Sequence, residues 1–390
     1  PDGNHLEESG GDGGMKWEKV KLGNVTDSCL GKMLDQNKNK GDYQPYLANV
    51  NVRWGEFDLE DLPLMKFEES EQERYELKYG DLVICEGGEP GRCAIWKEQI
   101  PNMKIQKALH RVRVHDCLDY RYLFYWFLLA GKTGELDQYF TGATIKHMPG
   151  QKLKEVVIDK PPLEIQHRIA DILSAYDDLI ENNQKQIKLL KEAAQRLYKE
   201  WFVDLHFPGH ENTKIVDGVP EGWRRGLLKE LISVNYGKDH KKVPDDGNIP
   251  VYGSGGLMRK CNKSLFSGEA VLIPRKGSLN NIMYVDETFW TVDTMFYATM
   301  KQPHTAVFVY FFVKAFDMYS MNIGAAVPSM TTKILDAMDV VIPDKETLEK
   351  FDKYAKVYFN KIKTLQGQNE QLKTARDLLL PKLMSGEVEV

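Results

Sequence analysis

The chain has 390 residues, of which 42% are hydrophobic and 28% are charged. These proportions are typical of globular proteins, and the length is sufficient for two or three domains with separate cores. The formal net charge of −5 excludes a protein that binds nucleic acid through a cationic surface spread over the whole molecule. If the chain binds DNA, its positive charge must be gathered locally.

Compartment and membrane association are indicated by the apolar runs and the cysteines. The runs 122–130 and 306–316 are about half a membrane span, so we interpret them as buried helices. The five cysteines show no Cys-x-x-Cys spacing, and no charged-then-apolar leader is found at the start. We therefore expect free thiols, a cytoplasmic location and no membrane association.

Residues 1–14 are rich in Gly and polar residues, and they precede Met15, which has the character of a natural start. We interpret this segment as an added tag. It contains four acidic residues and no Lys or Arg, so without it the net charge changes from −5 to −1.

Residues 15–162 are predicted to form a first domain of mixed α/β (α+β) structure. Short runs with strand character alternate with turns that contain Gly, Pro and Asn. The domain opens on Trp17, followed by an amphipathic stretch, and a Gly-acid-apolar strand is predicted from Gly80.

Candidate DNA contacts in the first domain are basic residues interleaved with Gly, Gln and aromatic residues. Glycine lets a backbone approach a phosphate, Lys and Arg neutralise it, and Arg, Asn and Gln can pair with base edges. The candidates are Lys32, Lys38, Arg53, Gly88, Arg92, Lys104, Gln106 and Lys107. For each of them, the ordinary alternative of a solvated surface charge stays open.

Residues 163–203 are predicted to form a long helix. It is preceded by Pro161-Pro162, which can open a helix but cannot continue one. From Ile169 to Trp201, mostly apolar residues recur at alternating spacings of four and three positions, which is the pattern of a coiled-coil seam. The central seam positions are Ile180, Asn183, Ile187, Leu190 and Leu197.

Residues 204–343 are predicted to form a second mixed α/β domain, which also opens on a Trp, Trp223. Its candidate DNA contacts have the same composition as those of the first domain. They are Lys238, Lys241, Lys242, Ser254, Arg259, Arg275, Lys276, Ser278 and Asn280. The stretch 275–281 is the strongest candidate, because a Pro-Arg-Lys-Gly-Ser turn after a strand presents donors on a rigid stem.

Residues 344–384 are predicted to form a second long helix, ending near Pro381 and Ser385-Gly386, and residues 385–390 form a tail. Its central seam positions are Ile362, Leu365, Asn369, Leu372 and Leu379. The two seams are expected to pack on each other as an antiparallel coiled coil. A buried Asn on each seam is typical of a residue that fixes the register of the two helices at some cost in stability. The alternative is a fluctuating layer of the seam that is partly accessible to water.

The two halves of the chain repeat at a spacing of 182 residues. Gly142–Met148 (GATIKHM) aligns with Gly324–Met330 (GAAVPSM), and Pro161 aligns with Pro343. The helices that follow keep this spacing without a gap. A repeat of this length is too long for a solenoid unit and indicates a duplicated domain plus helix, and hence an internal pseudo-twofold. The middles of the two domains barely match, which is expected if they recognise different targets.

Catalytic and metal-binding patterns are weak. No phosphate-binding loop is present, because Trp126 stands where the first glycine before Gly131-Lys132-Thr133 would have to be. The run from Lys160 to Leu163 does not match the tetrad of an adenine methyltransferase. The histidines lack metal-ligand spacing on a continuous helix. We therefore expect no catalytic residues, no metal and no cofactor in this chain.

The architecture resembles the specificity (S) subunit of Type I restriction-modification enzymes. The resemblance spans 15–390, and its most specific parts are the Pro-Pro-Leu-Glu-Ile-Gln run at 161–166 and the Arg-Lys-Gly-Ser turn at 275–278. The second helix departs from the pattern, because it begins with Pro-Asp-Lys-Glu-Thr-Leu.

This resemblance implies a non-catalytic subunit that recognises a bipartite sequence in double-stranded DNA. Each domain would read one half, and the paired helices would set the gap between the halves. The implied partners are methyltransferase (M) subunits and a restriction (R) subunit, which would carry S-adenosylmethionine, ATP and Mg²⁺. Two alternatives stay open: a coiled-coil scaffold with two protein-binding domains and no DNA role, and an enzyme with an unrecognised site.

Overall fold

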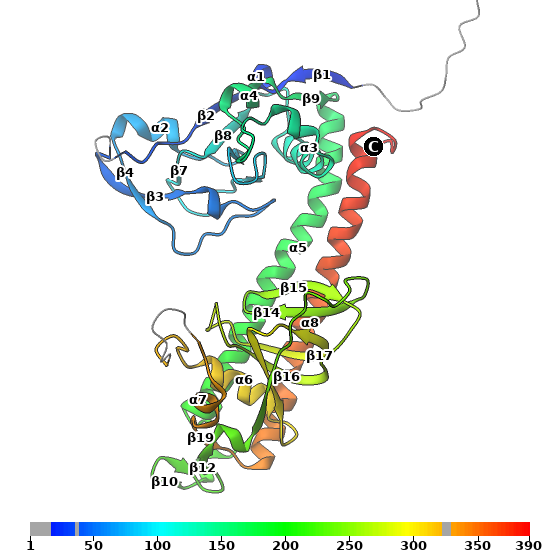
Figure 1. Ribbon diagram of the computed structural model, residues 1–390. Helices are drawn as coiled ribbons and strands as arrows, with labels where there is room; N and C mark the ends of the chain where they lie inside the picture. Colours follow the sequence, from blue (N-terminus) through cyan, green and yellow to red (C-terminus); the bar gives the residue numbers. More distant parts are fainter. Residues whose placement is uncertain (1–16, 36–38, 322–328) are drawn as a thin grey trace, which may run out of the picture. The chain divides into compact units, whose positions relative to one another are not determined.

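The computed structural model describes residues 17–35, 39–321 and 329–390 (Figure 1). The chain divides into two compact units. The first unit contains the chain up to Asn182 together with Gln368–Val390, and the second contains Asn183–Gly367. The predicted tag at 1–14, the candidate Lys38 and most of the second repeat motif at 324–330 lie outside the described residues.

The first unit contains a four-stranded antiparallel sheet in the order β2-β8-β5-β6. These strands are β2 (Thr26–Leu30), β8 (Leu109–Val114), β5 (Leu82–Cys85) and β6 (Cys93–Ile95). A three-stranded sheet in the order β4-β3-β7 contains β4 (Leu64–Phe67), β3 (Asp42–Leu47) and β7 (Lys104–Ile105). A pair of strands, β1 (Glu18–Lys21) and β9 (Val157–Lys160), joins the two ends of the domain.

The core of the first unit is built around α3 (Tyr120–Thr133). Asp119 caps this helix, because its carboxylate accepts hydrogen bonds from the Arg121 and Tyr122 backbone N–H groups. The residues from Tyr122 to Leu128 are all buried, which confirms that this apolar run is a core helix. The short helix α4 (Gly150–Glu155) precedes β9.

The second unit contains a six-stranded sheet in the order β13-β18-β16-β17-β14-β15. Its strands are β13 (Ile232–Tyr236), β18 (Met295–Met300), β16 (Phe266–Pro274), β17 (Met283–Thr291), β14 (Ile249–Gly253) and β15 (Gly256–Cys261). All neighbours are antiparallel except β14 and β17, which are parallel. The strands β12 (Arg224–Leu227) and β19 (Asp339–Ile342) join the ends of this domain, and β10 (Ile215–Val216) pairs with β11 (Val219–Pro220).

A buried helix also lies at the core of the second unit. In α6 (Ala306–Lys314), every residue from Ala306 to Phe311 is buried, and the helix packs in one cluster with β16, β18 and both long helices. The short helix α7 (Thr332–Asp336) precedes β19, as α4 precedes β9.

A common set of elements therefore occurs in both domains: the order β2, β5, β6, β8, α3, α4, β9 in the first corresponds to β13, β16, β17, β18, α6, α7, β19 in the second. The spacing of 182 residues holds for α4 and α7 and for β9 and β19, and a longer stretch between β2 and β5 makes the first domain larger. The predicted architecture of two mixed α/β domains, each followed by a long helix, is confirmed. The twofold relation between the units stays a prediction.

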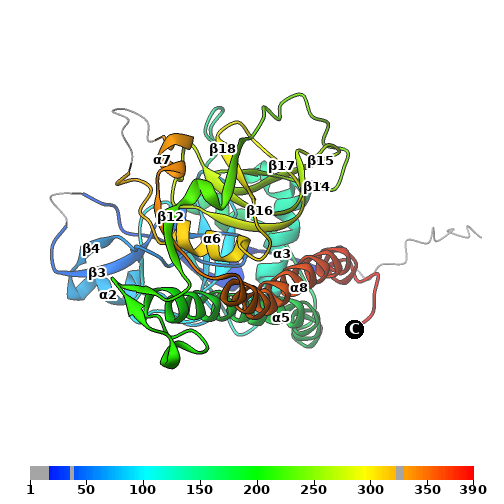
Figure 2. The same cartoon turned by 90° about the horizontal axis from the view of Figure 1, so that it is seen from below.

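The long helices are α5 (Leu163–Tyr198), which continues as a π-helical turn at Lys199–Val203, and α8 (Lys345–Met384). Each contributes a segment to both units, and the two segments in a unit lie side by side (Figure 2). In the first unit, the start of α5 packs in one cluster with the end of α8 through Leu173 and Leu383. In the second unit, the end of α5 packs with the start of α8 through Ala194 and Phe351. The segments are therefore antiparallel.

The side chains at the predicted seam positions are buried or half-buried. In the second unit, Ile187, Ile362 and Leu365 form a cluster on which Leu190 packs. Leu197 packs against the core of the second unit and Leu379 against that of the first. The remaining positions are Ile180, Asn183 and Asn369, which are buried, and Leu372, which is half-buried.

Each long helix begins at a different polar clamp. In the first unit, the fully buried Gln166 amide donates to the carbonyls of Pro161 (2.8 Å) and Cys117 (3.2 Å), and its oxygen accepts from the Asp119 N–H (2.8 Å). The Gln of the Pro-Pro-Leu-Glu-Ile-Gln run is thus a structural residue that fixes the entry of α5.

In the second unit, Asp344 supplies the clamp that Gln166 supplies in the first. Its carboxylate accepts from the backbone N–H and hydroxyl of Thr347 (2.9 and 2.7 Å) and from the Trp223 indole N–H (2.9 Å). Where the second helix departs from the first sequence pattern, an N-terminal cap by Asp344 therefore takes the place of the Gln166 contacts.

Candidate nucleic-acid interface

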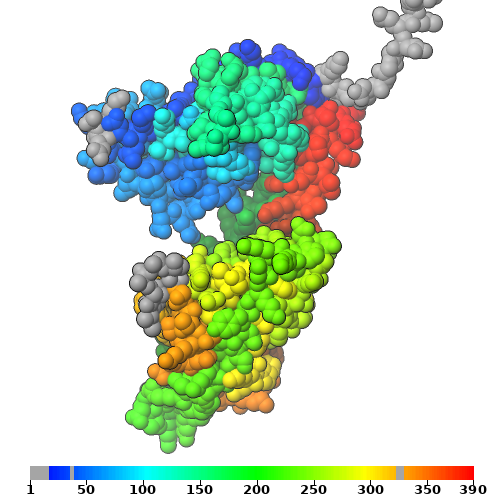
Figure 3. All heavy atoms as spheres, in the orientation of Figure 1, coloured from blue at the N-terminus to red at the C-terminus, as the bar shows by residue number. Residues whose placement is uncertain are grey.

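A loop that joins two antiparallel strands occupies the same place in each domain. Figure 3 shows all heavy atoms of the chain, coloured from blue at the N-terminus to red at the C-terminus. Glu86–Arg92 joins β5 to β6, and Arg275–Asn281 lies between β16 and β17 and is followed by Ile282. The Met148 N–H donates to the Glu86 carbonyl at 2.7 Å, and the Met330 N–H donates to the Arg275 carbonyl at 2.9 Å. Since Met148 and Met330 are the last residues of the two repeat motifs, the two loops are structurally equivalent.

The equivalence extends through the next two positions of the loops. Gly87 bridges to His147, and Lys276 bridges to Ser329, the repeat partner of His147. Gly88 and Gly277 follow, with φ angles of 74° and 84° in the left-handed region that favours glycine. We call the segments 86–92 and 275–281 the first and second hairpin loops. The two loops share these backbone contacts and differ in their side chains.

In the first hairpin loop, the exposed carboxylate of Glu89 is held at both oxygens. Its Oε1 accepts from the Trp54 indole N–H at 2.7 Å, and its Oε2 accepts from Arg92 Nη1 at 3.0 Å. Arg92 also donates to the Asn49 carbonyl at 3.1 Å, and Asn49 Nδ2 donates to the Gly87 carbonyl at 3.0 Å. The candidate Arg92 thus positions Glu89 and the loop.

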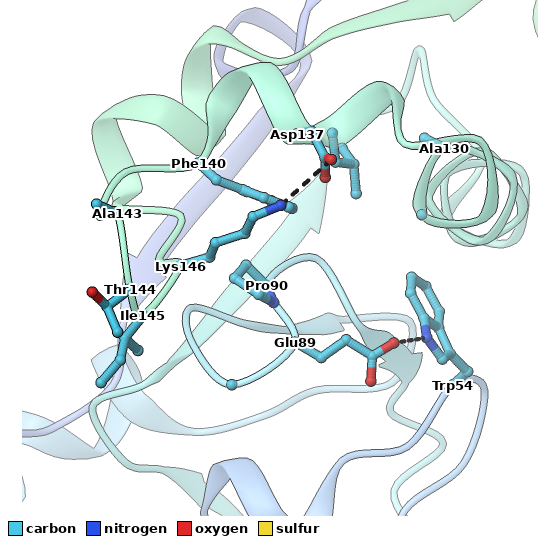
Figure 4. A pocket seen from close by; sticks show the side chains of 13 residues that line it. Trp54, Glu89, Pro90, Ala130, Asp137, Phe140, Ala143, Thr144, Ile145 and Lys146 are labelled. Atoms are coloured by element: carbon cyan, nitrogen blue, oxygen red, sulfur yellow. Dashed lines mark hydrogen bonds and ion pairs between the residues drawn. The ribbon is translucent and has the colours of Figure 1, made fainter.

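The first hairpin loop lines a groove of about 590 Å³ (Figure 4). Glu89 and Trp54 lie on one side of the groove, and Lys146 reaches toward Asp137 on the other, at 3.5 Å. Phe140 and the repeat motif complete the lining. The groove therefore combines aromatic faces, a fixed carboxylate and an exposed cation.

The repeat motif of the first domain forms an exposed hairpin beside this groove. Thr141 and His147 exchange two backbone hydrogen bonds, of 2.7 and 2.8 Å. Gly142 has φ 94°, and a Cβ there would lie 2.2 Å from the Ile145 carbonyl oxygen, so the turn requires glycine. Ile145 at the tip is 65% exposed.

In the second hairpin loop, only some of the predicted donors are presented to solvent. Lys276 and Ser278 are exposed, and the Arg275 guanidinium lies over the Tyr236 ring, 5.6 Å from its centroid. Asn280 is exposed, and both ends of its amide have partners: Nδ2 donates to Asp317 at 3.0 Å and Oδ1 accepts from the Met318 N–H at 2.8 Å. These two bonds support the loop, and the base contact of Asn280 stays a prediction.

Further polar residues of the second domain lie next to its hairpin loop or on neighbouring segments. Ser254 accepts a hydrogen bond from Asn281 Nδ2 at its carbonyl, at 2.8 Å. Arg259 is turned inward and donates to the carbonyls of His240 and Val243, at 2.6 and 2.9 Å. The exposed cations of the segment after β13 are Lys238, Lys241 and Lys242.

Two candidate lysines of the first domain are buried, which corrects their predicted role. Lys104 is fully buried, and its Nζ pairs with Glu76 Oε2 at 2.9 Å. Lys32 is buried, pairs with Glu71 and donates to the Lys66 carbonyl at 2.9 Å. Burial raises the pKa of Glu71, but the hydrogen bonds from Lys32 and from the Glu68 N–H, together with the charges of Lys32 and Arg74, outweigh it, so the pKa of Glu71 is lowered.

The other candidates of the first domain stay near the surface. Lys107 is exposed and Gln106 is half-buried beside it. Arg53 is exposed, donates to the Val50 carbonyl and lies 4.0 Å from the Asp58 carboxylate. Of the predicted residues, the structure brings together Gly88 and Arg92 in one loop, with Arg53 on the segment that supplies Trp54.

We expect Lys104→Ala to lower the free energy of unfolding by about 2–4 kcal/mol, because it removes one partner of a buried ion pair. The matched change Lys107→Ala removes an exposed lysine three residues away and should alter stability by less than about 0.5 kcal/mol. Urea denaturation of both variants measures the difference. Equal stabilities would contradict the structural role of Lys104.

Two kinds of group bear on catalysis and metal binding: the thiol next to the first hairpin loop and the described side chains that could bind a metal. Burial raises the pKa of the Cys85 thiol, which precedes the first hairpin loop, to about 11, so it stays protonated at neutral pH. Over the described ranges, no three His, Cys, Asp or Glu side chains are grouped as metal ligands. No helix in the part of the chain that the structure describes is long and apolar enough to cross a membrane.

A family model described as Type I restriction modification DNA specificity domain matches residues 15–192 and 220–374. The chain belongs to this family. Each match covers one mixed domain and most of the long helix that follows it. The resemblance inferred from the motifs is thereby confirmed, and DNA sequence recognition as part of a Type I restriction-modification system is the function of this specificity family.

Individual relatives span most of the chain. The Type I restriction enzyme MjaIX specificity subunit of Methanocaldococcus jannaschii is 27% identical over 352 residues, which cover 80% of this chain and 78% of the relative. The MjaVIII specificity subunit of the same organism is 24% identical over 414 residues, covering 96% and 93%.

A solved structure has the same fold. The crystal structure of the Type I restriction-modification system S subunit from M. genitalium superposes with a TM-score of 0.59 at 19% sequence identity. The superposition covers 96% of this chain and 97% of that chain.

For this member of the specificity family, the sequence did not predict the pairing of Trp54 with Glu89 or the stacking of Arg275 on Tyr236. Both partners come from segments outside the hairpin loops. A signal existed for the first pair, since Trp54 is a polar-flanked aromatic next to the candidate Arg53. The residues that face Trp54 could not be identified without the fold.

Proposed function

We propose that this chain reads a bipartite sequence in double-stranded DNA, one half-site with each domain. The observation that carries this proposal is the pair of equivalent hairpin loops, which share a frame and present different side chains. A shared frame is expected if both loops meet the same kind of surface, and different side chains are expected if they meet different bases. The family match to both halves of the chain supports the same reading.

We propose further that the two long helices set the gap between the half-sites. Seam residues of α5 and α8 pack together in both units, so each helix links one domain to the other through a continuous element. Helices of fixed rise are suited to act as a spacer.

The exposed apolar residues of these helices support assembly with other subunits. Leu179, Leu189, Val357 and Leu378 are each more than half exposed. Exposed apolar side chains that form a contiguous patch mark sites of protein interaction. We propose that methyltransferase subunits dock on the helices and that a restriction subunit joins the complex.

We propose that these partner subunits catalyse the reactions of the complex, methylation and cleavage of DNA. The chain would then act without a catalytic group of its own, and S-adenosylmethionine, ATP and Mg²⁺ would be bound by the methyltransferase and restriction subunits. A direct test is to assay adenine methylation by the methyltransferase subunits with and without this chain. Sequence-specific methylation only in its presence supports the assignment, whereas methylation by this chain alone would contradict it.

The second hairpin loop gives a sharper prediction. Lys276→Ala and Arg275→Ala should weaken binding, in the assembled complex, to DNA that carries the correct second half-site. The expected cost is about 1–3 kcal/mol for each base that the variant no longer recognises. The base preference at the first half-site should be unchanged. Lys214→Ala, which changes an exposed lysine of the same unit outside the hairpin loop and the long helices, is the matched control.

The comparison is made by titrating labelled duplexes that differ only in the second half-site. A loss of affinity that is equal for all duplexes, with a smaller dependence on salt, would instead mark Lys276 and Arg275 as phosphate contacts. No loss at any duplex would remove the second hairpin loop from the interface.

A further inference from the structure

The first hairpin loop carries a carboxylate at the position where the second carries a hydroxyl. The shared frame, in which the Glu86 and Arg275 carbonyls both accept from the last residue of a repeat motif, places Glu89 level with Ser278. It also places Glu86 and Gly87 level with Arg275 and Lys276. Equivalent surfaces of the two domains therefore have opposite charge.

Glu89 is held in one orientation while it stays open to solvent. The Trp54 indole N–H donates to one carboxylate oxygen at 2.7 Å, and the Arg92 guanidinium donates to the other at 3.0 Å. The Glu89 side chain is nevertheless 55% exposed, and each carboxylate oxygen has a second lone pair. Such a group accepts further hydrogen bonds without first losing rotamer freedom.

The DNA groups that such an acceptor can meet are few. A carboxylate is repelled by phosphates and by base-edge acceptors such as guanine O6 and N7. In the major groove, the donors are the exocyclic amino groups of adenine N6 and cytosine N4, and Glu and Asp accept from the latter. The groove of about 590 Å³ beside Glu89 leaves room for a base edge to approach (Figure 4).

We propose that Glu89 is a specificity-determining residue of the first domain, and that it accepts a hydrogen bond from the exocyclic amino group of an adenine or cytosine in the first half-site. Trp54 and Arg92 are positioning residues that hold the carboxylate. The inference rests on the proposed function, because it names the base chemistry that the first hairpin loop reads. The second hairpin loop, with Arg275 and Lys276, is suited to the acceptors of guanine.

The test uses the complex of this chain with its methyltransferase subunits and a pool of randomised duplexes. Glu89→Gln should change the preferred base at one position of the first half-site and leave the second half-site as in the unchanged protein. Glu86→Gln removes the same charge from a half-buried position of the same loop and should leave both half-sites unchanged. Thermal unfolding confirms that both variants are folded.

Duplexes with amino-deleted bases identify the partner at the position that changes. Replacing adenine there by purine, or cytosine by 2-pyrimidinone, removes only the exocyclic amino group. The unchanged protein should bind the matching analogue about tenfold more weakly, and Glu89→Gln should lose this discrimination. The arm that responds distinguishes adenine from cytosine.

Three outcomes would overturn the assignment of Glu89. The first is that Glu89→Gln prefers the same bases in the first half-site as the unchanged protein. The second is that Glu86→Gln shows the same change of preferred base, and the third is that the unchanged protein binds each analogue duplex as tightly as the duplex with the natural base. Failure of the proposed function is recognised separately, because the unchanged protein would then select no bipartite motif from the pool.

Discussion

Lengthening both long helices together is expected to widen the gap of the DNA target and to leave both half-sites unchanged. The insertion is a four-residue helical segment between Asn182 and Asn183 of α5 and a second between Gly367 and Gln368 of α8, where the two units divide. Four residues extend a helix by about 6 Å, the rise of one to two base pairs, and turn it by little more than one full turn. Sequences selected from randomised duplexes measure the gap.

Insertion into only one helix is the control for the matched pair. It displaces the seam residues of that helix by four positions relative to those of the other helix, so Ile187 no longer packs fully on Ile362 and Leu365. We expect this variant to be less stable and to bind DNA more weakly. A matched double insertion that keeps full affinity and the original gap would contradict the role of the helices as a spacer.

Removing the buried amide of Gln166 is expected to loosen the junction between the first domain and α5. Gln166→Ala leaves the Asp119 N–H without its side-chain acceptor and the carbonyls of Cys117 and Pro161 without their amide donor, in a position with no access to solvent. Unsatisfied buried groups cost about 1–3 kcal/mol each, so the loss of stability should reach about 2–4 kcal/mol.

Hydrogen exchange localises this effect better than global denaturation, since the chain has two units. The amides of α3 that follow the Asp119 cap should exchange faster in Gln166→Ala. Gln184→Ala, an exposed glutamine on the same helix, should leave them unchanged and alter stability by less than about 0.5 kcal/mol. Equal protection in both variants would show that Gln166 does not hold the junction.

The long helices could be predicted from the sequence because their period depends only on local spacing. A side chain at a seam position faces the partner helix, whichever domain lies beside it, so the pattern from Ile169 to Trp201 survives in the sequence. The buried core helices were also predictable, since an apolar run such as 122–130 has no other place in a globular protein.

The partners of charged loop residues could not be predicted in this way. Lys104 belongs to a basic stretch in the sequence, yet the fold places it against Glu76, 28 residues away, and buries both the stem and the charge. Asn280 likewise meets Asp317 only through the tertiary structure. Which partner a loop Asn binds, and whether a Lys is buried, depends on such distant contacts, which composition does not encode.

The equivalence of the hairpin loops was hidden for a related reason. The repeat spacing of 182 residues holds from the motif at Gly142 onward, but it fails in the middles of the domains, where Glu86 corresponds to Arg275. The hydrogen bonds from Met148 and Met330 establish the register, together with the bridges of Gly87 to His147 and of Lys276 to Ser329. The sequence therefore predicted a duplicated domain and helix, and the structure identifies the positions at which the two hairpin loops differ.

Selection from a randomised duplex pool tests the central claim most directly. The chain is purified together with its methyltransferase subunits, and the retained duplexes are sequenced. Two short motifs separated by a fixed unspecified gap are the predicted result. A single contiguous motif would contradict the assignment of one half-site to each domain, and no enrichment would favour a scaffold that does not read DNA.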